Sequence, residues 1–250
     1  MDSKNFKKTT VEYYERWLGE QGCLSNDADI QFIYSTERNV AQAGYPSQVD
    51  IYCWIQWDKI VVSYGDKAKP QINKLNQKLK LSLSVDEIAV ILSKMFNRHV
   101  NHTIKYVYAG GNSDATQKAK TLTKDDYSDY RNFFLGCYPN NSDDWLEEYF
   151  HKMVQSGHCV GVYEDARIAS CTDGPSMPYM TDKVQEIGIT TLPGHRGKGY
   201  AAIACTKMAE NIIANKKVPQ WSTPCSNIAS QKLAAKVGFV KIADVLTLTM

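Results

Sequence analysis

The chain has 250 residues, of which 43% are hydrophobic, and a formal net charge of +2 at pH 7. This length can bury a sizeable core and suits one large domain or two small ones. The nearly balanced charge gives no reason to expect nucleic acid or an acidic membrane as a partner. We interpret the lysines between residues 67 and 80 as a solvated face.

The sequence favours a soluble, cytoplasmic protein without a metal site. Residues 1–17 contain no apolar signal core, and no segment nears the ~20 apolar residues that cross a bilayer. Seven cysteines without a C-x-x-C pair argue against both a disulfide framework and a zinc site. The five histidines show no ligand spacing, so we predict that no metal is bound.

The first part of the chain mixes helical and strand patterns. Capping-box patterns at Thr9 and Ser84 predict two helix starts, and alternating apolar residues predict strands. The predicted elements are, in order, a helix from Thr9 to Leu18, strands near 30–34, 51–55 and 60–64, helices near 72–79 and 84–95, and a strand at 103–109.

A polar, glycine-led stretch at residues 110–118 has no hydrophobic periodicity and predicts a domain boundary. We therefore expect a smaller α+β domain over residues 1–112. A second domain, of mixed α/β composition, is expected over residues 119–250.

The second part begins with two helices and continues with strands. Thr123 and Ser142 are the predicted caps of these helices, and Gly238 stands where a C-cap glycine belongs. The later elements are hairpin strands at 159–163 and 167–171, a strand at 183–191, a helix near 200–215, a strand near Trp221, a helix at 227–237 and a last strand from Phe239.

The stretch LPGHRGKGYAAIA, residues 192–204, places glycines and two cations directly ahead of a predicted helix. Such a loop is either an anion site or a surface turn. A Walker loop requires Ser or Thr after its lysine, and none follows Lys198. Gly197, Gly199 and Ala202 match a dinucleotide fingerprint, but the acidic residue expected about 20 positions later is absent.

A third pattern, R/Q-x-x-G-x-G/A, is matched by Arg196, Gly199 and Ala201. The later motif N-x-x-[AS]…GF is matched from Asn227 to Phe239. Over roughly residues 119–250 the sequence thus resembles the GCN5-related N-acetyltransferase (GNAT) superfamily. Residues 169–191 also resemble the subgroup of the zwittermicin A resistance protein, in which a second domain precedes the catalytic one.

The resemblance implies the GNAT acyl-CoA N-acyltransferase fold in the C-terminal part, with acetyl-CoA or coenzyme A as co-substrate. The smaller N-terminal domain is then an acceptor-side or degenerate GNAT-like domain. The loop would hold the pyrophosphate, and the preceding strand would pair with the pantetheine arm. Arg196 and Lys198 are also compatible with a solvated surface. The implied cofactor-binding residues are Ile189, Thr191, Arg196, Gly197, Lys198, Gly199, Tyr200, Ala201, Asn227 and Ser230.

The resemblance implies acetylation of a primary amine on a small molecule or peptide by a monomer or homodimer. Glu186 is the candidate base, acting directly or through water, and a strand-entry salt bridge is its alternative role. Many relatives carry a proton-donating tyrosine where this chain has Ala234. The thiolate then either leaves unprotonated or takes its proton from Cys225, Ser226 or Tyr179. The alternative function is a non-catalytic acyl-CoA sensor or interaction module.

Overall fold

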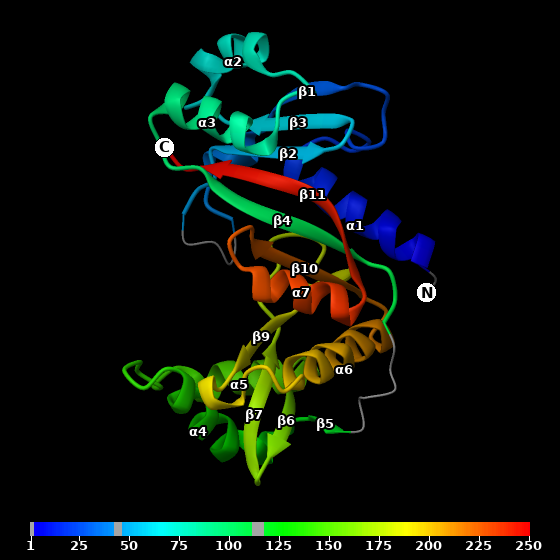
Figure 1. The fold of residues 1–250 in the computed structure, drawn as a ribbon, viewed down its shortest axis with the longest axis vertical. Coiled ribbons are helices and arrows are strands. Elements are labelled where there is room, and N and C mark those ends of the chain that lie inside the picture. The colour runs from blue at the N-terminus through cyan, green and yellow to red at the C-terminus, as the bar shows by residue number, and fades with distance from the viewer. Residues whose placement is uncertain (1–2, 43–46, 112–117) are drawn as a thin grey trace.

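The computed structural model describes residues 3–42, 47–111 and 118–250, whose strands form two sheets along the long axis of the molecule (Figure 1). The larger sheet has the strand order β1-β3-β2-β11-β4-β10-β8, and the smaller has the order β5-β6-β7-β9. The larger sheet contains β1 (Ile30–Tyr34), β2 (Ile51–Gln56), β3 (Lys59–Tyr64), β4 (Asn101–Tyr108), β8 (Val184–Glu186), β10 (Val218–Pro224) and β11 (Phe239–Leu248). The smaller sheet contains β5 (Ala119–Thr121), β6 (Val160–Glu164), β7 (Arg167–Asp173) and β9 (Gly188–Thr191). This mixed α+β arrangement confirms the predicted fold class.

Seven described α-helices cover the two sheets. The helices are α1 (Ser3–Leu18), α2 (Ile72–Lys78), α3 (Val85–Phe96), α4 (Tyr127–Cys137), α5 (Leu146–Gln155), α6 (Tyr200–Ala214) and α7 (Ile228–Val237). In Figure 1, α2 and α3 lie at the end that carries β1 and β3, whereas α4 and α5 lie at the opposite end beside the smaller sheet. The α6 and α7 helices lie between these ends, where the two sheets approach each other.

The first helix begins earlier than its capping-box pattern predicts. It starts at Ser3, so Thr9 lies inside the helix and the predicted start there is wrong. The reason is an apolar stripe that extends upstream of Thr9, because Phe6 is buried against Tyr108 with ring centroids 5.6 Å apart. At the other end of the helix, Trp17 stacks on Tyr52 at 5.3 Å. These contacts hold α1 against the larger sheet.

The larger sheet joins the two parts of the chain. The β4 strand precedes the predicted boundary, yet it pairs with both β10 and β11, which follow it. Tyr106 is opposite Trp221 on one side and Lys241 on the other. The β11 strand also pairs with β2 through its second half. Residues 112–117 lie outside the described residues, and the division into domains 1–112 and 119–250 stays a prediction about independent folding.

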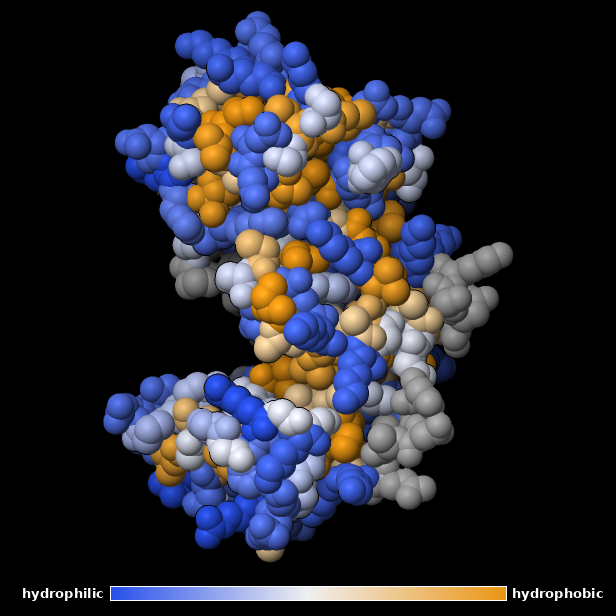
Figure 2. Space-filling view, viewed as in Figure 1, coloured by the Kyte–Doolittle hydropathy of each residue, from blue (hydrophilic) through white to orange (hydrophobic). Residues whose placement is uncertain are grey.

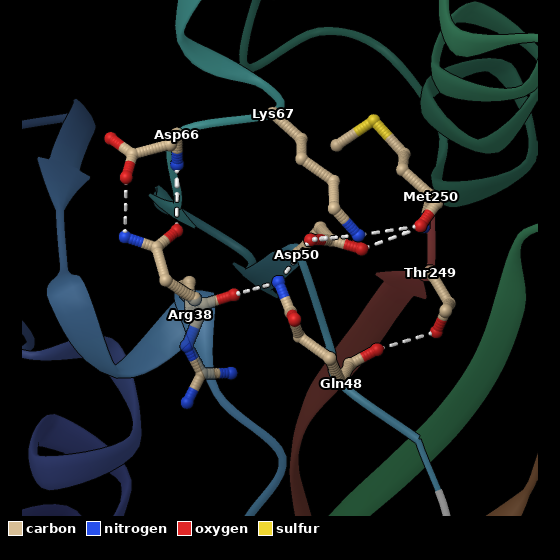
Figure 3. A network of polar contacts seen from close by, with 8 residues as sticks. Arg38, Gln48, Asp50, Asp66, Lys67, Thr249 and Met250 are labelled. Atoms are coloured by element: carbon tan, nitrogen blue, oxygen red, sulfur yellow. Dashed lines mark hydrogen bonds and ion pairs between the residues drawn. The ribbon is translucent and has the colours of Figure 1, made fainter.

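A buried polar network fixes the end of β11 beside the start of β2 (Figure 3). The fully buried carboxylate of Asp50 accepts a hydrogen bond from the backbone N–H of Met250 at 2.6 Å and forms an ion pair with Lys67 at 3.4 Å. Lys67 also donates to the Met250 carbonyl at 2.7 Å. A buried carboxylate is stable only with such partners, so the network specifies where this strand ends.

The smaller sheet packs against α4 and α5 through a core rich in aromatic residues.

Of the predicted caps of these two helices, one is confirmed and one is wrong. Thr123 and Asp126 form the predicted capping box ahead of α4, with the Thr123 N–H donating to Asp126 at 2.8 Å. The predicted Ser142 cap is wrong, because α5 begins only at Leu146. Ser142 instead donates to Asp144 at 2.7 Å within the preceding turn, a local competition that is common for serine.

Candidate active site

A single stretch of chain passes from the larger sheet to the smaller one. Sequence analysis predicts one strand over residues 183–191, whereas the structure divides it into β8 and β9. Glu186 pairs with Gln220 in the larger sheet, and Gly188 pairs with Asp173 in the smaller one. Ile187, between them, is buried and donates to the Gln220 carbonyl at 3.1 Å. The two sheets therefore separate at Ile187.

A cavity of about 850 Å³ opens beside this separation. Figure 2 shows the molecule hollowed between the α7 region and the end that carries α4 and α5. The cavity is lined by Tyr138, Ile189, Thr190, Thr191, His195, Arg196, Gly197, Gly199, Tyr200, Ala201, Ala202, Asn227, Ala229, Ser230, Lys232, Leu233 and Lys236. Nine of the ten predicted cofactor-binding residues are in this set, and Lys198 is the exception.

The glycine loop brings the N-terminus of α6 to the cavity. Gly197 and Gly199 have φ values of 81° and 86°, in the left-handed region that side chains disfavour. Gly199 is the N-cap of α6, and the first hydrogen bonds of the helix are donated by Ala202 and Ile203. The amides of Tyr200 and Ala201 precede those bonds at the positive end of the helix, which is a suitable site for an anion.

A carboxylate at the end of β6 holds the loop together. Glu164 accepts hydrogen bonds from Tyr200 at 2.6 Å, from Lys198 at 2.9 and 3.0 Å, and from His195. The hydrogen bonds from Tyr200 and Lys198 lower the pKa of Glu164 to about 2, so the carboxylate is ionised near neutral pH. Lys198 is thus paired with a carboxylate rather than lining the cavity. Glu164 carries no motif, so sequence analysis missed it.

Positive charge on the cavity wall comes from the loop and from α7. Arg196 is held in place by an Nε hydrogen bond to the Thr191 carbonyl at 3.4 Å, and Lys232 and Lys236 lie one turn apart on α7. Sequence analysis missed these two lysines, although their i, i+4 spacing predicts a shared helix face. Together with the helix N-terminus, the three cations favour an anionic ligand.

The start of α7 also lines the cavity, and Asn227 caps this helix as predicted. The Asn227 side chain caps α7 by accepting a hydrogen bond from the Ser230 N–H at 3.0 Å. The Ser230 hydroxyl in turn accepts from the Trp221 indole at 3.2 Å. Further along α7, Ala234 is completely buried. Because its side chain is a methyl group, the helix has no hydroxyl at that position.

Glu186 lies next to the sheet separation but does not line the cavity. Its half-buried carboxylate accepts a hydrogen bond from the Ser222 hydroxyl. Lys105, opposite Ser222 on β4, is buried nearby, and burial lowers the pKa of its amine while Glu186 opposes that shift. The role of Glu186 as a base therefore stays a prediction, and any contact with a ligand in the cavity requires an intervening group.

The predicted substitutes for the missing tyrosine lie away from the cavity lining. Tyr179 packs edge-on against Trp17 of α1 at 5.3 Å, and neither Cys225 nor Ser226 lines the cavity. Tyr138, which sequence analysis did not single out, does line it, and its hydroxyl is 3.3 Å from the Thr190 hydroxyl.

The described residues contain neither a metal-ligand cluster nor a helix that could cross a membrane. No group of three or more His, Cys, Asp and Glu side chains is arranged to hold a metal ion in residues 3–42, 47–111 and 118–250. Within the same ranges every helix is too short or too polar to span a bilayer.

Comparisons with known proteins agree with this geometry. A model of the GNAT acetyltransferase family matches residues 53–245, so the match begins in β2 rather than at residue 119. A GNAT-family acetyltransferase from Colwellia psychrerythraea has 13% identity and a TM-score of 0.54, over 74% of this chain and 72% of that chain. A GCN5-related N-acetyltransferase from Sphaerobacter thermophilus has 13% identity and a TM-score of 0.50, over 65% of this chain and 55% of that chain. No curated protein sequence matched the chain. These likenesses show a shared fold.

Proposed function

Because this chain belongs to the GNAT acetyltransferase family, we propose that it transfers an acetyl group from acetyl-CoA to a primary amine of a small molecule or peptide. The observation that carries this proposal is the cavity at the N-terminus of α6. It combines the backbone amides that precede the first hydrogen bonds of α6, two glycines in the left-handed region and three cationic side chains. Coenzyme A carries phosphate groups that match these features.

The loop and α7 would hold the phosphates. The amides from Gly197 to Ala201 are suited to the pyrophosphate, and Arg196 would add a charge-assisted contact. Lys232 and Lys236 would bind a further phosphate. Lys198 would act through Glu164, by keeping the loop in its shape rather than by contacting the ligand.

The exposed edge of β9 would hold the pantetheine arm. The β9 strand is the outer strand of the smaller sheet, and β8 is the outer strand of the larger one. An edge strand has backbone N–H and C=O groups without a neighbouring strand. Those near Ile189 and Thr191 line the cavity and are suited to the amides of pantetheine.

The proposed reaction has three parts. Glu186, through a water molecule, would accept a proton from the acceptor's ammonium group. The neutral amine would then attack the thioester carbonyl carbon, forming the C–N bond and breaking the C–S bond. The thiolate would leave either unprotonated or with a proton from Tyr138, which is on the cavity wall. The amine nitrogen would give up its second proton as the amide forms, either to water or, through water, to the Tyr138 oxygen, which restores the tyrosine.

One observation favours a second function, which is acyl-CoA binding without catalysis. Ala234 is buried at the position where many GNAT enzymes have a tyrosine that donates a proton to the leaving thiolate. A protein without a proton donor could bind acyl-CoA and report it to a partner. Tyr138 and Glu186 make catalysis the better-supported proposal.

The two functions are separated by measuring binding and turnover on the same protein. Calorimetry with CoA tests the cavity, and release of free thiol from acetyl-CoA across a panel of amines tests catalysis. We expect both, with Glu186→Gln lowering turnover but leaving CoA affinity unchanged, and with the exposed Glu20→Gln as the matched control. Binding without turnover for any amine supports the sensor, and absence of CoA binding contradicts both functions.

A further inference from the structure

A second cavity, of about 340 Å³, lies beside the first. Its walls come from α4, the turn before α5, the end of β7 and β9. Tyr138 and Thr190 line both cavities, and their hydroxyls are 3.3 Å apart. The second cavity therefore begins where the proposed pantetheine strand faces α4. Its volume, near the lower limit for ligand sites, suits a small molecule.

A carboxylate lines this cavity. Asp173 is partly buried at the end of β7, and its Oδ2 accepts a hydrogen bond from the Tyr149 hydroxyl at 3.3 Å. Burial raises the pKa of Asp173, the hydrogen bond from Tyr149 opposes that shift, and the neighbouring Glu186 carboxylate adds to it. No lysine, arginine or histidine among the described residues forms an ion pair with Asp173. Withdrawing a carboxylate from water without a cation beside it is costly, so a cationic ligand would stabilise the partly buried Asp173.

The position of Asp173 depends on a glycine of β9. Gly188 is the residue opposite Asp173 in the strand pair. A Cβ at Gly188 would be only 1.6 Å from Asp173 Oδ1, so any larger residue would displace the carboxylate. The carboxylate thus lies directly against the backbone at which the two sheets separate.

Aromatic rings also line the same cavity. Trp145 is edge-on to Phe134 at 5.5 Å and to Tyr149 at 5.5 Å. Trp145 is 50% exposed and lines the cavity with both of these residues. Aromatic faces attract organic cations as well as hydrocarbon groups, and the attraction adds to that of a carboxylate.

We propose that the second cavity binds the acceptor as a small organic ammonium ion, with its charge toward Asp173 and its hydrocarbon part against Trp145, Phe134 and Tyr149. This inference rests on the proposed acetyltransferase function and names its acceptor class. The same carboxylate repels an acceptor that carries its own carboxylate close to the amine. The class is therefore an alkyl or arylalkyl amine rather than a free amino acid.

The test compares isosteric ligands on the CoA-loaded protein. Calorimetry is carried out with 2-phenylethylamine and pentylamine, with their neutral analogues 2-phenylethanol and pentanol, and with phenylalanine. We expect at least one of the two amines to bind at least tenfold more tightly than its alcohol, and phenylalanine to bind at least tenfold more weakly than 2-phenylethylamine. Asp173→Asn should abolish the preference for amine over alcohol, and the exposed Asp182→Asn should leave it intact.

Two controls keep the result interpretable. The Kd for CoA should change by less than twofold in both variants, because Asp173 does not line the first cavity. Trp145→Ala should weaken 2-phenylethylamine and 2-phenylethanol together, because it removes a shared wall without removing the charge. If CoA binds normally but neither amine binds more tightly than its alcohol, or if Asp173→Asn keeps the preference, this inference is overturned while the proposed function stands. Loss of CoA binding in the unmodified protein instead overturns the proposed function.

Discussion

Gly197→Ala tests whether the left-handed backbone of the loop is required for CoA binding. Gly197 has a φ of 81°, and a Cβ at this position would meet no atom within 4 Å. The substitution therefore introduces no clash with the protein, and its cost is conformational. Holding a residue with a Cβ in the left-handed region costs about 1–2 kcal/mol. Since each 1.4 kcal/mol is about tenfold in affinity, the full cost corresponds to a roughly 5- to 30-fold change in Kd.

This cost can be distributed between folding and binding, so both must be measured. If the alanine variant keeps the loop conformation, the free protein loses stability. If the loop relaxes, CoA has to restore the conformation and its Kd rises. We expect urea unfolding and CoA calorimetry to give losses that sum to about 1–2 kcal/mol.

Gly194→Ala is the matched control from the same loop. Its φ is outside the left-handed region and a Cβ there would also meet no atom within 4 Å. It should change neither measurement by more than about 0.5 kcal/mol, as for an ordinary surface substitution. The reasoning is refuted if the summed loss for Gly197→Ala is as small as that for Gly194→Ala.

Three further outcomes are expected. Arg196→Ala should weaken CoA binding by about 1–3 kcal/mol, as for one charge-assisted hydrogen bond, whereas the exposed Arg98→Ala should leave calorimetric affinity unchanged. The pKa of Glu164 is lowered in the folded protein, so its ionised form contributes stability above its ordinary pKa of 4.5 that is lost as the pH falls toward 2. The Glu164→Gln variant should therefore have a lower free energy of unfolding than the unmodified protein at pH 5, and this difference should become smaller at pH 3. A difference that stays constant in chemical denaturation at the two pH values would contradict this. Finally, a fragment of residues 119–250 tests the predicted division into domains 1–112 and 119–250. The fragment lacks β4, which lies between β10 and β11, so we expect no cooperative unfolding transition in circular dichroism. A sharp transition would show that it folds alone, as the predicted division requires.

The parts of the fold and site that could be predicted from sequence are those with local causes. The capping box at Ser84 is present, Asn227 caps α7, and Gly238 ends that helix with a φ of 105°. In each case the residue type satisfies a backbone requirement within a few positions, so the pattern is visible in a short window. The same holds for the glycine loop, whose two left-handed glycines precede α6.

The features that could not be predicted depend on residues distant in sequence. The division of residues 183–191 at Ile187 follows from which strands are adjacent, and strand pairing is not recorded in local periodicity. The contact of Glu164 with the loop joins residues more than thirty positions apart. The second cavity likewise brings Asp173 of β7 together with Trp145 and Tyr149, which are more than twenty positions earlier in the chain. Residue types at such positions are ordinary, and only their three-dimensional neighbours give them a role.

The shared use of β11 has a consequence for how the protein is made. During synthesis β2 and β4 leave the ribosome well before residues 239–248, which occupy the position between them. Until then each strand has an unpaired edge, and such edges are prone to associate with other chains. The larger sheet therefore cannot close until β11 has been synthesised. Because its central pairing joins residues far apart in sequence, we expect folding of the whole chain to be slow and sensitive to chaperones.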